Sequence, residues 1–154
     1  MFDVPVDAWY VWVGLSIASA TTFGIAAAVP ATPPPDAAGA TETIDNVAAS
    51  QYAAVGEHPM SNADELRIAG DVVSLRGPGG TVDETLLYGP VAPAHEGDLA
   101  AIRRGTPPES VFDSPVAFKQ AIEAAITAEA EYHRTDRIVV RRVSWGGVDV
   151  TLVG

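Results

Sequence analysis

The feature that most constrains this chain is an unbroken run without a charged side chain, residues 8–29. As an α-helix rising about 1.5 Å per residue, the run would be roughly 33 Å long, close to the hydrocarbon thickness of a bilayer. The preceding flank, residues 1–7, carries two aspartates and no base, unlike the positive start of a secretory signal peptide. We therefore predict a single-pass transmembrane helix within residues 1–29 and a place in the cell membrane. A cleaved signal peptide and a buried core helix are the alternatives.

Two sets of residues on this helix predict its contacts. Aromatic side chains cluster at one end, where they would form a membrane-interface belt; they are Trp9, Tyr10 and Trp12. Small residues recur at four-residue spacing, which lets a second helix approach closely; they are Ser16, Ala20, Gly24 and Ala28. The predicted partners are therefore membrane lipid and other membrane subunits, or a second copy of the chain.

The charge balance excludes one class of partner. The 154 residues include 20 acidic and 9 basic side chains, for a net charge of −11, and Lys119 is the only lysine. Such a surface repels nucleic acid phosphates, so we predict no nucleic acid partner. At molar salt this self-repulsion is screened, which favours a salt-loving organism over an ordinary acidic protein. No base precedes Arg67, so orientation is weakly determined, and we expect an extracytoplasmic C-terminal domain.

The region after the helix predicts a linker and one small domain. Residues 30–40 are rich in proline and alanine and should form an extended connector. Residues 41–154 are long enough for one modest core. Residues 41–55 have apolar side chains at helical spacing, with Thr41 as a possible N-cap and His58-Pro59 as the end of the helix.

Turn and strand signals fill the rest of the domain. Ser114 and Pro115 predict the start of the main helix, residues 115–133, and a short helix is expected near residues 97–104. Strands are expected in a meander and in a hairpin around Gly146-Gly147; their ranges are 65–69, 72–75, 81–88, 137–144 and 148–153. The predicted fold class is α+β, an antiparallel sheet of about five strands packed by one main helix.

No motif in the sequence carries a chemistry. The histidines, His58, His95 and His133, are far apart and match no metal pattern. Glu129 and His133 would share a helix face, but two ligands do not make a site. The cluster Gly77–Gly80 lacks the Lys-Ser/Thr of a phosphate loop, and no nucleophile elbow occurs. We predict no catalytic residue, no metal and no cofactor.

The predicted strand 137–144 carries the main cluster of positive charge, Arg137, Arg141 and Arg142. Arg141 and Arg142 lie on opposite faces of this strand, so they cannot both be buried on one side. They could pair with nearby acidic residues, meet an acidic partner or protect a sheet edge, and edge protection is favoured. Trp145 is interpreted as a lid on the core.

Three segments carry a resemblance: MFDVPVDAWYVWVG, PPPDAAGA and VVSLRGPGGTVDETLLYGPV. Together they resemble an uncharacterised family of haloarchaeal membrane proteins along essentially the whole chain. The resemblance implies association with type IV pilus-like systems and a minor pilin-like or accessory subunit. The flank Asp3-Val4-Pro5-Val6-Asp7 departs from a prepilin processing site, because it has no base.

The function expected from these features is non-enzymatic. We predict a membrane-anchored subunit of a haloarchaeal cell-surface assembly or secretion apparatus. A membrane-tethered binding or sensor domain for a small solute is the alternative, and a tethered hydrolase is less favoured.

Overall fold

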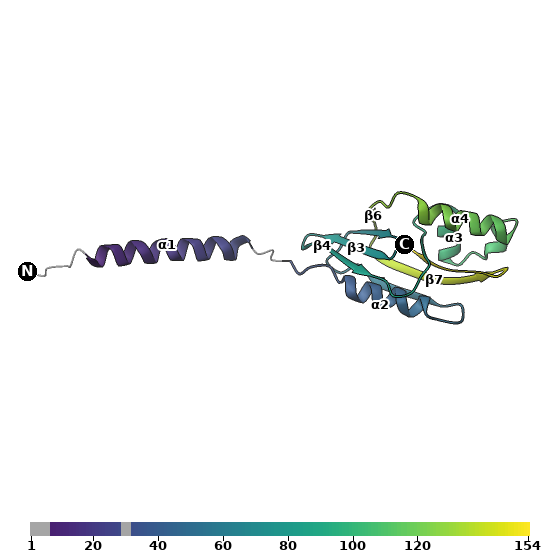
Figure 1. Cartoon of the computed structure of the whole chain (residues 1–154), viewed down its shortest axis with the longest axis horizontal. Helices are drawn as coiled ribbons and strands as arrows, with labels where there is room; N and C mark the ends of the chain where they lie inside the picture. Colours follow the sequence, from purple (N-terminus) through teal and green to yellow (C-terminus); the bar gives the residue numbers. More distant parts are fainter. Residues whose placement is uncertain (1–6, 29–31) are drawn as a thin grey trace, which may run out of the picture. The chain divides into compact units, whose positions relative to one another are not determined.

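The computed structural model describes the backbone of residues 7–28 and 32–154, and the side chains of residues 9–19 and 32–154 (Figure 1). The chain divides into two units, Met1–Ala31 and Thr32–Gly154. The first unit contains helix α1 (Asp7–Ala28), and the second contains every other helix and strand.

The prediction of a transmembrane helix is wrong. Among the residues that the structure describes, no helix combines the length and the hydropathy needed to cross a bilayer.

Helix α2 (Ala37–Ala48) begins four residues before the sequence prediction. Asp36 is its N-cap, and the Asp36 carboxylate accepts a hydrogen bond of 3.0 Å from the Gly39 amide. Thr41 lies inside the helix, where its hydroxyl donates to the Ala37 carbonyl at 2.6 Å. The proposed Thr41 cap is therefore wrong, and residues 37–40 form the first turn of α2.

Two four-stranded sheets replace the single sheet of about five strands, so this part of the fold prediction is also wrong. The first sheet has the order β1 (Val55–Pro59), β7 (Arg137–Trp145), β8 (Val148–Val153) and β5 (Val91–Pro93). The second has the order β4 (Gly80–Thr85), β3 (Val72–Gly77), β2 (Glu65–Ala69) and β6 (His133–Arg134). Only β5, which runs parallel to β8, breaks the antiparallel pattern of the described pairs.

The three unpredicted strands are short or atypical. β5 has three residues and β6 has two, so neither is long enough to show alternation of apolar and polar side chains. β1 contains Gly56 and Pro59, which are depleted in strands, and it pairs only with β7 at a sheet edge.

The predicted meander and hairpin are confirmed. β2, β3 and β4 pair in succession, and β7 pairs with β8 from Val140–Val153 to Trp145–Val148. Both residues of the connecting turn have positive φ, 58° at Gly146 and 81° at Gly147, as a two-residue hairpin turn of type I′ requires.

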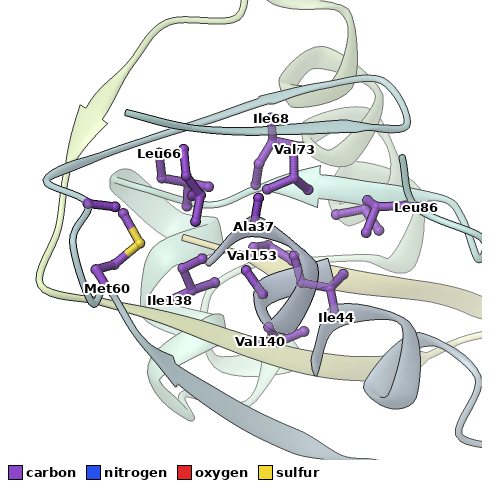
Figure 2. Close-up of a cluster of buried hydrophobic side chains, with 14 of the residues drawn as sticks. Ala37, Ile44, Met60, Leu66, Ile68, Val73, Leu86, Ile138, Val140 and Val153 are labelled. Atoms are coloured by element: carbon purple, nitrogen blue, oxygen red, sulfur yellow. The ribbon is translucent and has the colours of Figure 1, made fainter. Parts of the chain in front are cut away.

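One buried cluster lies between the two sheets and α2 (Figure 2). Ala37 and Ile44 come from α2, Leu66 and Val73 from the second sheet, and Ile138 from the first. All five side chains are fully or almost fully buried. Because α2 contributes to this cluster together with both sheets, its burial joins them into one core.

A second cluster covers the other face of the first sheet, where α3 (Gly97–Arg104) and α4 (Pro115–Thr127) lie (Figure 1). Ser114 caps α4 by accepting from the Ala117 amide at 3.2 Å, as predicted. A short 3-10 helix, η1 (Pro108–Ser110), separates the two helices. Trp145 packs against Phe118 with 5.9 Å between ring centroids, which agrees with its interpretation as a lid.

Candidate interaction surfaces

Helix α1 carries large apolar side chains that are exposed. Within residues 9–17, seven of them are between 39% and 70% accessible: Trp9, Tyr10, Val11, Trp12, Val13, Leu15 and Ile17. Consecutive positions of a helix point in different directions, so these side chains surround the helix rather than form one stripe. A helix that is apolar on all sides is normally buried against other protein or lipid. The N-terminal half of α1 is therefore a candidate interaction surface.

The predicted small-residue face is only partly within the described side chains. The Ser16 hydroxyl donates to the Trp12 carbonyl at 2.8 Å, one turn earlier on the same helix. This bond satisfies the hydroxyl without water, so Ser16 does not oppose burial. The side chains of Ala20, Gly24 and Ala28 lie outside those that the structure describes.

A cavity of about 300 Å³ is the second candidate surface, and it lies in the Thr32–Gly154 unit. One wall is the segment after α4, residues 128–133, and the other is the segment from the end of β5 into α3, residues 93–99. Ile68 of β2 and Ala125 of α4 contribute apolar surface between them. β6 pairs with Glu65 and Leu66 of β2, and Ile68, which lies beyond these paired residues, lines the cavity.

Two histidines from opposite walls stack on each other. The rings of His95 and His133 have centroids 3.9 Å apart and an interplanar angle of 19°. Burial, the charge of His133 and the charge of Arg103, in that order, lower the pKa of His95 to about 4. His95 is therefore neutral at pH 7, which permits this close ring contact without charge repulsion.

An aromatic side chain fastens the 128–133 wall to the second sheet. The guanidinium carbon of Arg76 lies 3.6 Å from the centroid of the Tyr132 ring, and that of Arg67 lies 5.0 Å from it. Both are cation–π contacts. Together with the pairing of β6 on β2, they hold His133 opposite His95.

This arrangement corrects the expected end of the main helix. α4 ends at Thr127, and Ala128 is already extended at φ −62° and ψ 154°. The prediction that Glu129 and His133 share a helix face is wrong, because both residues follow the end of α4. Both nevertheless line the cavity. Within the part of the chain that the structure describes, no three His, Cys, Asp or Glu side chains are grouped to hold a metal ion.

The stacked histidines could not be found from sequence. His95 and His133 are 38 positions apart, and neither stands in a recognised pattern. Their contact depends on the two-residue strand β6 and on the early end of α4, neither of which has a clear sequence signal. His58 lies elsewhere, 3.7 Å from the N-cap carboxylate of Asp36.

Arg141 and Arg142 of β7 bind helix ends rather than acidic partners. Arg141 donates from Nε to the Arg103 carbonyl at 2.7 Å, near the end of α3. Arg142 donates from Nη1 to the Ala48 carbonyl at 2.9 Å, at the end of α2. The two side chains lie on opposite faces of the strand, and each is partly buried. Edge protection, the favoured interpretation from sequence, is therefore wrong for both.

The Gly77–Gly80 cluster is a turn, as expected, and two of its glycines also allow close backbone contacts. A Cβ on Gly77 would lie 2.0 Å from the Asn62 carbonyl oxygen, and one on Gly79 would lie 2.3 Å from the Pro33 carbonyl oxygen. Both contacts are with backbone, which cannot move aside easily. The β3–β4 turn is therefore packed against residues 33 and 62, and its glycines have a packing role.

The fold and these surfaces define a protein with an apolar N-terminal helix and an acidic α+β domain of two four-stranded sheets. Residues 3–143 match the model of a family of unknown function, DUF7283, and the chain belongs to that family. No curated protein matches the chain. No solved structure matches it either.

Proposed function

We propose that the chain is a non-enzymatic subunit of a haloarchaeal cell-surface assembly or secretion apparatus, and that α1 packs against helices of neighbouring subunits. The observation that carries this proposal is the set of seven exposed apolar residues in residues 9–17. In the proposed assembly, neighbouring helices cover these side chains and the acidic domain makes further protein contacts.

The energy available from this surface is large enough to drive association. Fully burying one large apolar side chain stabilises by about 1.5–3 kcal/mol. Seven partly exposed side chains therefore supply an amount comparable to the cost of association, which is about 4–15 kcal/mol. The internal hydrogen bond of Ser16 removes a polar group that would otherwise resist burial in such a contact.

The cell-surface setting of the proposal is supported by sequence. The resemblance to an uncharacterised haloarchaeal family extends along the chain and implies an association with pilus-like systems. The acidic, lysine-poor composition fits a protein that works at high salt. With a net charge of −11, neighbouring copies would repel one another at low ionic strength. Molar salt reduces the Debye length to about 3 Å and allows apolar contacts to dominate.

Sedimentation velocity of the full chain in 2 M KCl tests the proposal. The double variant Val11→Gln with Leu15→Gln places two amides one helical turn apart on α1, and Gln retains good helix propensity. The matched control is Val116→Gln, because Val116 is 65% exposed on α4 of the domain. We expect the unmodified chain and the control to sediment as assemblies and the double variant to sediment as a monomer.

Equal sedimentation of all three proteins would contradict the proposal. Flotation with neutral phosphatidylcholine vesicles tests whether lipid or other protein covers the apolar side chains of α1. Recovery of the chain as vesicle-bound monomers would also contradict it, since lipid rather than neighbouring subunits would then cover the apolar side chains. Unchanged assembly in the presence of vesicles would support it.

A further inference from the structure

We propose that the cavity between residues 93–99 and 128–133 binds a small organic cation, a primary ammonium or guanidinium group on a short apolar body. This inference is independent of the assembly proposed for α1. It depends on the shape of the cavity, on its apolar surface and on the charges at its rim.

The size and the surface of the cavity fit a compact ligand. Its volume of about 300 Å³ is at the lower end of the range for small-molecule sites. Ile68, Leu99 and Ala125 contribute apolar surface from three different elements. An alkyl chain of a few carbons can cover this surface, and its burial contributes about 0.8 kcal/mol per CH₂.

The charged groups at the rim have no partners of their own. Glu96 lies on one wall, and Glu129 and Glu131 lie on the other. Within residues 9–19 and 32–154, none of the three carboxylates forms an ion pair or a hydrogen bond. Each is exposed and would bind a lone cation weakly. Their placement on both sides of one cavity favours a cation with several N–H donors that can reach more than one carboxylate.

Among the described residues, no positive side chain near the cavity pairs with these carboxylates. His95 is neutral at pH 7, because its pKa is lowered to about 4, chiefly by burial. Arg103, whose charge contributes to the lowered pKa of His95, donates from Nη1 to the Gly154 carbonyl oxygen. The neutral His95 ring, stacked on His133, therefore forms a flat part of the wall. Since no three donors are grouped for a metal among the described residues, an organic cation fits the spaced carboxylates better than a metal ion does.

Titration of the full chain with n-butylammonium chloride, followed by NMR of the His95 and His133 ring protons, tests the proposal. The matched probes are neutral n-butanol and anionic butyrate, which share the alkyl chain. We expect a saturable shift of both ring signals with n-butylammonium alone. Equal responses to all three probes, or no response to n-butylammonium, would overturn the proposal.

Charge-removing variants test the role of the rim. Glu129→Gln with Glu131→Gln keeps the size of both side chains and removes two charges from one wall. The matched control is Glu109→Gln, because Glu109 is exposed in η1 and does not line the cavity. We expect the double variant to weaken n-butylammonium binding at least tenfold and the control to bind like the unmodified chain. Unchanged binding by the double variant, or equal weakening by the control, would overturn the proposal. Both cavity experiments are independent of the proposed function: their expected results stay the same even if α1 does not mediate assembly.

Discussion

Arg141 and Arg142 are adjacent in β7, and their side chains bind helices on opposite faces of this strand. Each donates to a carbonyl at or near the C-terminal end of a helix, Arg141 at α3 and Arg142 at α2. The last carbonyls of a helix lack partners within the helix and carry partial negative charge, so a guanidinium is a suitable cap. Through these bonds β7 holds α2 on one face and α3 on the other.

The substitution Arg142→Met tests this capping role. Met keeps the length and the apolar stem but removes the donor to the Ala48 carbonyl, so we expect a loss of about 1–2 kcal/mol in the free energy of unfolding. Arg137→Met is the control, since the Arg137 side chain forms exposed ion pairs with Glu57 and Asp136, at 3.8 Å and 3.7 Å. It should cost under about 0.5 kcal/mol. Urea denaturation measures both, and equal effects would contradict the capping role.

The pKa of His95 predicts a loss of stability on acidification. Its pKa is about 4 in the folded chain, against 6.5 for a free side chain, so the unfolded chain binds a proton first. The contribution of this group is therefore present in full above pH 6.5 and is lost as the pH falls toward 4. Because the ring is partly exposed, we expect a loss of only about 1–2 kcal/mol.

NMR titration of the His95 ring protons checks this prediction. We expect a midpoint near pH 4 in the folded chain, caused first by burial and then by His133 and Arg103. In urea denaturation, His95→Asn should lose less stability between pH 7 and pH 4.5 than the unmodified chain. A midpoint near 6.5 would show that the stacked, buried environment is not maintained in solution.

Among the elements, those with local signals were predicted and those fixed by distant contacts were not. Ser114 and Pro115 marked the start of α4, and Gly146-Gly147 marked the β7–β8 turn, because caps and turns depend on a few adjacent residues. β5 and β6 depend on pairing with strands far along the chain. The cavity has no sequence signal, since its walls meet only after β6 pairs with β2.

The segment after α4 illustrates such a distant contact. The sequence predicts that the helix continues past Thr127, but α4 ends there. In the following segment, Tyr132 packs against Arg67 and Arg76 of the second sheet. Tertiary contacts therefore override local helix propensity at this point. The same contacts place Glu129, Glu131 and His133 along one wall of the cavity.

The substitution Tyr132→Leu tests whether the ring fastens this segment. Leu keeps an apolar side chain but removes the ring over which the two guanidinium groups lie, so residues 128–134 should open more often. We expect faster amide hydrogen exchange in this segment and unchanged exchange in α2. The control Tyr88→Leu alters a half-exposed tyrosine on the loop before β5 and should leave residues 128–134 unchanged. Equal exchange in Tyr132→Leu and the unmodified chain would contradict the fastening role.

At the scale of the whole molecule, the two units differ in whether their apolar side chains are buried. Residues of the Thr32–Gly154 unit form both buried clusters, so this unit has a core of its own. The described part of α1 instead exposes its large side chains. The sequence located this apolar helix correctly, but its lack of charge led to the mistaken prediction of a membrane span. In the proposed assembly, this exposed part of α1 is the surface that other copies or subunits cover.

Site-directed cross-linking tests this central claim most directly. The chain has no cysteine, so an introduced one reports on a single position. A disulfide forms only when two Cα atoms come within about 4.4–6.8 Å of each other. Leu15→Cys probes α1, and Val116→Cys probes an exposed apolar position of the domain. Under mild oxidation in 2 M KCl, we expect disulfide-linked dimers of Leu15→Cys and monomers of Val116→Cys. Monomers of both variants, or equal dimer formation by both, would contradict the claim.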